Sequence, residues 1–271
     1  MDSHQLPRRL GCFFINNIKN MKSIIAIVSD FGDDFAVAQL VGVIKKINHE
    51  AEVVILANDI SPFNIGEGAF VLAEGSKYFP QGTIFVGVID PGVGTSRRSL
   101  VLETDSGWYV GPDNGLFTLI IKDQRIKRVT VIHEDKINET RTATFHGRDV
   151  FAHVAAKLSL GQNQNDWGAS IQIGELNQLK FRDNEIIYFD CYGNAKINQN
   201  CDRFSFGDKL KISCKSKSIE VIFGKTFGDV TVGDFVAYKG SNNCLELAIN
   251  QDSVREKLGL RLGQILQIDK E

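Results

Sequence analysis

The sequence lacks most of the features that mark specialised classes of protein. Its five cysteines are odd in number and include no C-x-x-C pair, and their spacing fits neither a zinc site nor a disulfide framework. No apolar run approaches the roughly 18 residues that a membrane-spanning helix requires. The amino-terminal stretch has no apolar core or cleavage site of a signal peptide. From these absences we expect a cytoplasmic protein with no membrane segment.

An excess of charge of either sign is also missing. The chain has 31 basic and 33 acidic residues, and its net charge of −2 provides no basic surplus to neutralise nucleic-acid phosphates. Hydrophobic residues make up 43% and charged residues 24% of the 271 positions, which excludes a wholly disordered chain. We therefore expect a globular protein of one large or two ordinary domains that binds a small molecule and no nucleic acid.

The first half of the chain alternates strand patterns with helix patterns. Residues 1–20 show neither, and we interpret them as a disordered extension or as the result of a start assigned upstream of Met21. After them, apolar runs of strand length alternate with stretches of helical periodicity: strands at 23–30, 52–59 and 83–90, and helices at 35–47 and 65–79. This alternation predicts an α/β fold with a Rossmann-like parallel sheet.

The pattern changes after about residue 180. Before this point it predicts four further elements: a hairpin around 105–107, a short helix at 114–121, a strand at 129–133 and a helix at 148–160. After it, short alternating segments are separated by Gly, Asn, Asp and Ser turns, which is typical of a small all-β barrel or sandwich. We therefore expect two domains, an α/β domain over residues 21–178 and an all-β barrel over residues 183–271.

Polar side chains stand at the ends of the predicted parallel strands. Asp30 ends the first strand and Asp90 the third, and a later loop places His146 at the start of a helix. Ligands of open parallel sheets bind beyond the carboxyl ends of the strands, so these residues predict a pocket at one edge of the sheet. Asp30 is placed either to hold a ribose or to cap a helix, whereas Asp33 and Asp34 resemble acids of a first helical turn.

The loop from Asp90 to Arg97 gives the strongest local signal. A proline and two glycines fix a tight backbone that a ligand can approach closely, and the carboxylate and guanidinium are spaced to form a charge-assisted pair. The alternative is a surface loop with an ordinary ion pair. The phosphate-binding motifs G-x-x-x-x-G-K-S/T and G-x-G-x-x-G are both absent.

A metal site is the less favoured interpretation of His146, Asp149 and His153. Asp149 and His153 are spaced to share one face of a helix. No third ligand is evident in the sequence, and the polar face of an amphipathic helix explains the pair equally well. We therefore expect no metal.

Taken together, these stretches resemble one family, the S-adenosylmethionine hydrolases, which share their fold with fluorinating and chlorinating enzymes that act on the same substrate. The resemblance runs from about Ser29 to Ile268 and rests on the order and spacing of SDFG, SPFNIGEGA, DPGVGTSRR, YVGPDNGLF, TFHGRDVFA, DCYGN and LELAIN. It implies an α/β domain joined to a β-barrel domain in a homotrimer, with each site between the first domain of one subunit and the second domain of its neighbour. It also implies a cytoplasmic enzyme with S-adenosyl-L-methionine as its substrate and with no cofactor.

The resemblance implies three substrate contacts in the first domain. Asp30 would hold the ribose hydroxyls, Asp34 would approach the methionine part, and Phe63 would form an aromatic wall. The loop between Gly32 and Val37 is one residue shorter than in most relatives, which leaves the choice between Asp33 and Asp34 open.

In the second domain, the resemblance assigns Asp190 and Asn194 to the methionine and adenine ends of the substrate, with Tyr192 beside them as another aromatic surface. Ser241 falls in the loop by which the neighbouring subunit closes the site. Glu246 lies in the strand beyond that loop.

Asp90, Arg97 and His146 match the triad of the hydrolases, whereas the halogenating relatives carry Tyr in place of Asp90. The resemblance therefore predicts water as the nucleophile at the ribose 5′ carbon. The sulfonium leaves as a neutral thioether, so the reaction requires no general acid but does require a positioned, partly desolvated water. Since a carboxylate paired with a guanidinium is a poor base, we expect Asp90 to fix the water, and proton acceptance by His146 is a hypothesis.

Three alternatives to a hydrolase stay open from the sequence. A halogenase is disfavoured by Asp90, and a non-catalytic adenosine or S-adenosylmethionine sensor is disfavoured by the intact triad. A metal-dependent phosphohydrolase is disfavoured by the few metal ligands and by the absent phosphate loop.

Overall fold

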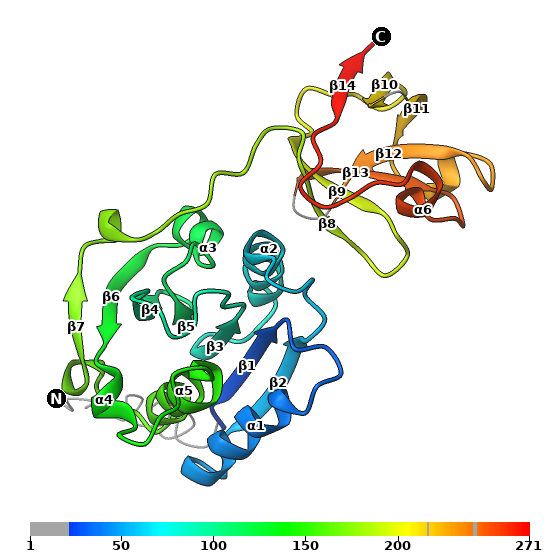
Figure 1. The fold of residues 1–271 in the computed structure, drawn as a ribbon. Coiled ribbons are helices and arrows are strands. Elements are labelled where there is room, and N and C mark those ends of the chain that lie inside the picture. Colours follow the sequence, from blue (N-terminus) through cyan, green and yellow to red (C-terminus); the bar gives the residue numbers. More distant parts are fainter. Residues whose placement is uncertain (1–21, 216, 241–242) are drawn as a thin grey trace, which may run out of the picture.

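The structure, a computed structural model, describes residues 22–215, 217–240 and 243–271. The extension expected at residues 1–20 and the predicted site residue Ser241 lie outside the described residues. Figure 1 shows two units, each built on one seven-stranded sheet. Along the chain, β7 (Gly168–Ile171) is the last strand of the first sheet and β8 (Ile186–Phe189) is the first strand of the second.

The first sheet is mixed. Its order is β2-β1-β3-β5-β4-β6-β7, formed with β7 by β1 (Ile24–Ser29), β2 (Glu52–Ala57), β3 (Thr83–Val88), β4 (Ser99–Thr104), β5 (Gly107–Pro112) and β6 (Ile126–Ile132). The strands β2, β1, β3 and β5 pair in parallel, whereas β4 pairs antiparallel with β5 and β6, and β6 with β7. The expected α/β domain with parallel strands is therefore confirmed for β2, β1, β3 and β5. It is wrong for β4, β6 and β7, because the predicted hairpin β4–β5 introduces antiparallel pairing.

Helices cover both faces of this sheet. The helices α1 (Ala36–Ile47) and α5 (Ala152–Ser159) pack on one face, and α2 (Ile65–Ser76) and α3 (Thr118–Asp123) on the other (Figure 1). Within β1, Ile25 and Ile27 belong to the first layer, and Ala26 and Val28 to the second. Alternate side chains of a strand point to opposite faces, so a strand covered on both sides is apolar at every position. This explains the uninterrupted apolar run at 23–30. Among the described residues, none of the helices combines the length and the apolar character needed to cross a membrane.

The second domain is a curled sheet of order β14-β10-β11-β12-β13-β9-β8. Beside β8 it contains β9 (Ala195–Asn200), β10 (Lys209–Cys214), β11 (Lys217–Gly224), β12 (Phe235–Lys239), β13 (Cys244–Ile249), β14 (Gln267–Lys270) and the short helix α6 (Val254–Leu258). Its two edges approach each other, because the N–H of Ile186 donates to Gln264 (2.9 Å) and that of Leu266 donates to Asn184 (3.0 Å). The domain is thus a partly closed version of the predicted barrel, joined by irregular backbone rather than by a strand pair.

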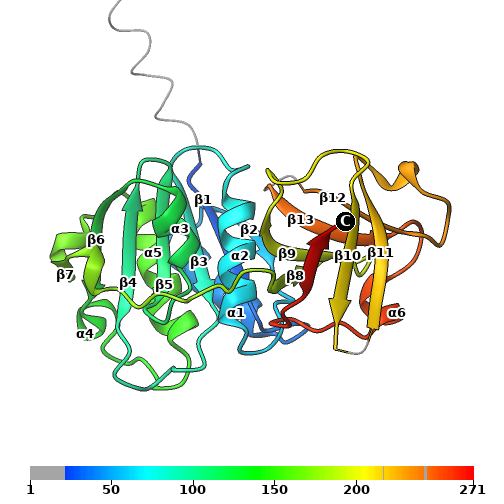
Figure 2. The ribbon, with the colours of Figure 1, turned by 90° about the horizontal axis from the view of Figure 1, so that it is seen from above.

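The linker between the sheets, residues 172–185, is hydrogen-bonded to the first domain through Asp113, which follows β5. Asp113 is 3% exposed and accepts from the Arg98 guanidinium at 2.5 Å and from the Asn177 N–H at 3.0 Å. The second domain then contacts α2 through the rings of Phe70 and Tyr188, 5.4 Å apart. Figure 2 shows β8 beside α2 in this arrangement.

Candidate active site

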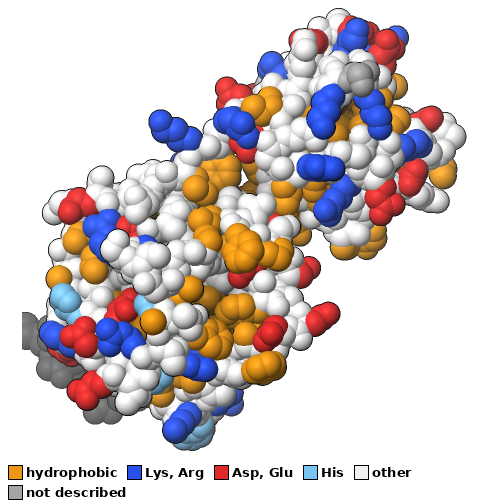
Figure 3. Space-filling view, in the orientation of Figure 1, with side chains coloured by type: hydrophobic (Ala, Val, Ile, Leu, Met, Phe, Trp, Pro, Cys, Tyr) orange, Lys and Arg blue, Asp and Glu red, His pale blue; other side chains and the backbone are white. Residues whose placement is uncertain are grey.

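The loops that follow β1, β2 and β3 and the loop before α5 line a cavity of about 260 Å³ at the carboxyl edge of the first sheet. Asp30, Phe63, Asp90, Phe145 and His146 are among the residues that line it. This is the edge where open parallel sheets bind ligands. Figure 3 shows hydrophobic side chains exposed on this domain and along its junction with the second domain.

Arg97 fastens Asp90 at the wall of the cavity. The Nη2 of Arg97 lies 2.5 Å from Oδ2 of Asp90, and the Nε lies 3.0 Å from each carboxylate oxygen. Only 6% of the Asp90 side chain and 8% of the Arg97 side chain are exposed. The sequence therefore predicted the right partners, and their burial excludes the alternative of an ordinary surface pair. In such a desolvated position the electrostatic effect of the pair is stronger than in water.

Gly94 brings this loop against the loop that carries His146. It has a φ of +78°, and a Cβ at this position would lie 2.8 Å from the carbonyl oxygen of Ala143. A side chain would therefore meet both backbone strain and a collision. The close approach expected of a ligand at this glycine is made instead by the neighbouring loop.

His146 completes the cluster. Its Nδ1 lies 2.8 Å from the Arg97 Nη2, and the residue is 6% exposed. It directly precedes a π-helical turn, η2 (Gly147–Phe151), which is the first part of the helix predicted at 148–160. Such π-turns are often found at functional sites.

Asp149 holds the loop in front of His146. Its Oδ2 accepts from the N–H and the hydroxyl of Thr142 at 2.8 and 2.7 Å, and its Oδ1 accepts from Arg148 at 2.6 Å. The Arg148 guanidinium in turn lies 4.7 Å from the ring centre of Phe145, a residue of the cavity wall. Asp149 is therefore fully engaged by its own loop, which argues against the metal interpretation.

Burial is the largest influence on the pKa of His146 and lowers it below the ordinary value. The carboxylates of Glu134 and Asp90 raise this pKa, whereas the cations of Arg97 and Arg141 lower it. The net effect is a lowered pKa, so the imidazole is neutral at pH 7.

Glu134 is a member of the cluster that the sequence analysis missed. It opens the short helix α4 (Glu134–Ile137), accepts a hydrogen bond from the Ser99 hydroxyl, and its Oε1 lies 3.3 Å from His146 Nδ1 and 3.6 Å from Arg97 Nη1. It stands two residues after β6, whose carboxyl end lies at the same edge of the sheet as that of β5. The signal that could have found it is its place just after the predicted strand 129–133, because Asp30 and Asp90 were identified by the same position after the first and third strands.

Asp30 and Phe63 are coupled through the backbone. The N–H of Phe63 donates to Oδ2 of Asp30 at 2.8 Å, which leaves Oδ1 of Asp30 for a ligand. Phe63 has a φ of +66°, an unusual value for a bulky residue, and its side chain is 71% exposed. Asp34 is exposed and accepts from the N–H of Ala36 at 2.7 Å. It lies two residues before α1, so the expectation of an acid within the first helical turn is wrong, although its carboxylate binds the first N–H of the helix.

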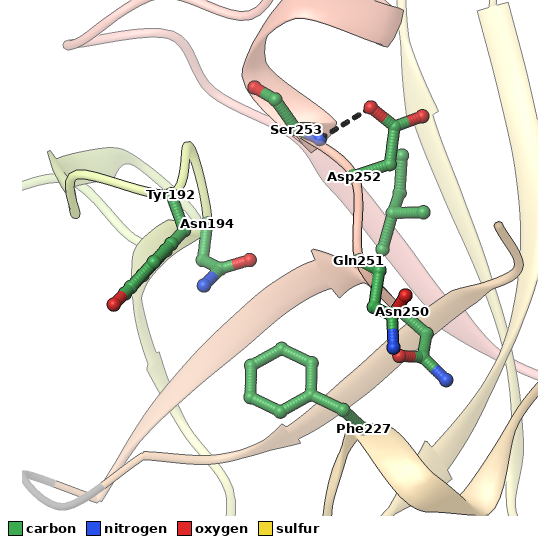
Figure 4. Close-up of a pocket in the computed structure, with 8 residues that line it drawn as sticks. Tyr192, Asn194, Phe227, Asn250, Gln251, Asp252 and Ser253 are labelled. Carbon is green, nitrogen blue, oxygen red and sulfur yellow. Dashed lines mark hydrogen bonds between the residues drawn. The ribbon is translucent and has the colours of Figure 1, made fainter. Parts of the chain in front are cut away.

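Two of the predicted second-domain residues, Tyr192 and Asn194, line a separate cavity of about 530 Å³ (Figure 4). Asp190 organises the turn before it, accepting from the N–H of Tyr192 at 3.0 Å and from the side-chain amide of Asn194 at 2.8 Å. Tyr192 is 76% exposed, and Asn194 is buried. Phe227 lines the same cavity across from Tyr192 and was missed, because its segment has only the pattern of a turn.

Glu246 lies inside the second domain rather than at this cavity. It is buried, pairs with the Lys196 ammonium, and its Oε2 accepts from the Tyr238 hydroxyl at 2.9 Å. These two partners satisfy the carboxylate internally.

The predicted residues therefore fall in two groups that line different cavities, Asp90 and His146 in the first domain and Tyr192 and Asn194 in the second. In the described ranges, no group of three or more His, Cys, Asp or Glu side chains is placed to hold a metal ion.

Known proteins are similar to this chain in both sequence and fold. The family models of the SAM hydroxide adenosyltransferase N-terminal and C-terminal domains match residues 25–168 and 184–267. A protein of Methanocaldococcus jannaschii named (R)-S-adenosyl-L-methionine hydrolase is 33% identical, over 88% of this chain and 92% of its own length. A protein of the same name from Thermus thermophilus is 34% identical, over 90% and 98%. A crystal structure of an uncharacterized conserved protein from Thermotoga maritima superposes with a TM-score of 0.84 at 31% identity, covering 90% of this chain and 99% of the other. The chain belongs to the SAM hydroxide adenosyltransferase family.

Proposed function

We propose that this protein hydrolyses S-adenosyl-L-methionine to adenosine and L-methionine, by attack of water on the ribose 5′ carbon. The observation that carries the proposal is the buried cluster of Asp90, Arg97 and His146 at the wall of a cavity. The names of the relatives from Methanocaldococcus jannaschii and Thermus thermophilus support the same reaction.

The cluster suits a nucleophile that must be held rather than strongly activated. The sulfonium departs as a neutral thioether and needs no proton. Arg97 occupies both oxygens of Asp90 with hydrogen bonds, so the carboxylate is held in place and keeps its remaining lone pairs for a water. Because the pair is buried, a water bound to it is partly desolvated and oriented in advance of the attack.

The substrate would span the two groups of residues. We propose that the free Oδ1 of Asp30 binds the ribose hydroxyls and that Phe63 packs against the substrate. The exposed rings of Tyr192 and Phe227 face one cavity and suit the flat faces of an adenine. Asp190 would act by holding Asn194, whose buried amide offers a donor and an acceptor.

We propose that these two groups meet between subunits of a homotrimer. Each subunit would then contribute its α/β domain (21–178) to one site and its all-β domain (183–271) to another. The large exposed aromatics Phe63 and Tyr192 support this assembly, because such side chains gather at surfaces that a partner or a ligand covers.

Mixing two inactive variants tests the shared site. Asp90→Ala and Tyr192→Ala change opposite halves, and Tyr192 is exposed enough for its truncation to leave the fold intact. Co-expressed variants should regain activity that neither has alone, and light scattering should give the mass of three chains. If the co-expressed variants regain no activity, each site is formed by a single chain.

Product analysis tests the reaction itself. The purified full chain is incubated with S-adenosyl-L-methionine, with and without chloride and with and without a chelator, and the products are separated by chromatography. Adenosine and methionine that are formed by the wild type, lost in Asp90→Ala and unaffected by chelator would support a cofactor-free hydrolase. A halogenated adenosine would replace the proposal with a halogenase, and tight adenosine binding without turnover would replace it with a sensor.

The proposed enzyme would work in the cytoplasm. Cys191, Cys201 and Cys214 form no disulfide in the described part of the chain, which supports a reducing compartment. Fractionation of cells with an antibody to the chain would test this location.

A further inference from the structure

The proposed reaction leaves a proton to be removed. A new bond joins the water oxygen to the 5′ carbon, and the bond from that carbon to sulfur breaks with its electron pair on sulfur. The product oxygen then carries one proton too many until a base takes it. Asp90, tied to Arg97, is poorly suited to this task, and His146 is the neutral base nearest to it in the cluster.

The Nδ1 of His146 has two neighbours of opposite kind. Arg97 Nη2, at 2.8 Å, is a group that only donates, and Glu134 Oε1, at 3.3 Å, is a carboxylate oxygen that only accepts. An Nδ1 lone pair satisfies Arg97 and places the ring proton on Nε2, where no further proton can be accepted. An Nδ1–H faces Glu134 Oε1 and leaves a lone pair on Nε2, while Arg97 Nη2 keeps the hydrogen bond that it donates to Asp90 Oδ2 at 2.5 Å.

We propose that Glu134 is a positioning residue that holds the proton of His146 on Nδ1, so that Nε2 accepts the proton of the attacking water. The proposal deepens the hydrolase function and rests on it. In the balanced step, the sulfonium substrate, one water and the neutral imidazole become methionine, adenosine and an imidazolium, and the imidazolium gives its extra proton to solvent afterwards. The protonated product is a strong acid, so an imidazole whose pKa is lowered still accepts its proton.

Glu134 contacts other members of the cluster, His146 at 3.3 Å and Arg97 at 3.6 Å, rather than the substrate cavity. It is not among the residues that line the cavity, and the Ser99 hydroxyl and Arg141, whose Nε lies 3.5 Å from Oε2, keep its carboxylate in position. The charged groups that surround the imidazole are Asp90 and Glu134, which favour its protonated form, and Arg97 and Arg141, which oppose it. Glu134 and Arg141 therefore influence His146 with opposite signs.

The variants Glu134→Gln and Arg141→Gln test the proposal on the full chain. Glu134→Gln removes one charge without changing the shape, and it should lower kcat about tenfold or more with an unchanged KM, because a positioned base contributes ~10²–10⁴-fold. The acid limb of the pH–rate profile should move to lower pH in Glu134→Gln and to higher pH in Arg141→Gln. Asp135→Asn is the matched control, because it removes an exposed carboxylate from the same turn of α4 and should change neither kcat nor the limb. Melting curves verify that each variant folds.

A second measurement separates this proposal from the proposed function. The ¹⁵N shifts of the labelled His146 ring report which nitrogen carries the proton, with or without turnover. A shift of the proton from Nδ1 to Nε2 in Glu134→Gln supports the role of Glu134 even in a protein that does not hydrolyse S-adenosyl-L-methionine. Wild-type kinetics in Glu134→Gln, an equal loss in Asp135→Asn, or an unchanged ¹⁵N pattern would each overturn it.

Discussion

Asp149 offers the most quantitative test of how the site is built. Its carboxylate accepts two hydrogen bonds from Thr142 and two close ones from the guanidinium of Arg148, and it thereby holds the loop that leads to His146. Replacement by Asn keeps the size of the side chain and removes its charge. We therefore expect Asp149→Asn to destabilise the first domain in a way that depends on pH.

The magnitude follows from the pKa of this carboxyl. Burial alone would raise it, but the hydrogen bonds from Arg148 and Thr142 outweigh burial and lower the pKa of Asp149 to about 2. An unfolded aspartate titrates near 3.9, and the difference corresponds to about 2.6 kcal/mol of folding free energy above pH 5. The Arg148 side chain is 29% exposed, so solvent weakens the pair and we expect a loss of about 2 kcal/mol in the variant.

The sign of the pH dependence is fixed by the direction of this shift. The stabilisation is complete above the unfolded pKa and disappears as the pH falls toward 2, so about half of it should be gone at pH 3. Urea unfolding should be measured for wild type and Asp149→Asn at pH 7 and at lower pH. The difference between their free energies of unfolding should become smaller as the pH falls. At pH 7 the melting temperature should fall by ~4–8 °C. Equal losses at all pH values would refute the role of the charge, and a loss below about 0.5 kcal/mol would refute the role of the contacts.

Three further perturbations test other parts of the structure. Lys196→Met leaves the buried carboxylate of Glu246 without its cation and should cost about 3 kcal/mol in urea unfolding, whereas exchange of both residues for Met and Leu should come close to wild type. Phe63→Asn relieves the left-handed backbone and should stabilise by about 1 kcal/mol while raising KM; a lowered melting temperature would show that the conformation is unstrained. Asp113→Asn weakens the fastening of the linker at Asn177 and should speed proteolytic cleavage there about tenfold, and an unchanged rate would show that other contacts hold the linker.

Much of the fold could be predicted because burial on two faces leaves a clear signature. The strands β1 and β3 lie under helices on both sides, so their apolar runs were found to within two residues of each end. The edge strand β7 was missed, since its four residues are partly exposed and show no apolar period. The strand β9 was missed for a related reason, because its outer positions are polar.

The site was predictable where a short loop or the ends of predicted parallel strands bring its residues together, as for Asp30, Asp90 and His146. Asp90 and Arg97 flank one short loop, so their spacing alone indicated the pair. Glu134 reaches His146 because β6 pairs with β4, and this strand order depends on packing that no local pattern records. The same holds for Tyr192 and Phe227, which face one cavity from separate turns of the second domain.

The antiparallel course of β4 has a consequence for how this chemistry can change. Because β4 starts at the edge of the sheet where β3 ends, with β5 between the two strands, the chain supplies both Asp90 and Arg97 without crossing the sheet. A parallel crossover would need a dozen or more residues and a covering helix between them. Both residues of the ion pair therefore lie within one segment of eight consecutive residues, and this segment can be replaced without changing the strands that flank it. A single exchange of this segment could give the same scaffold a different nucleophile.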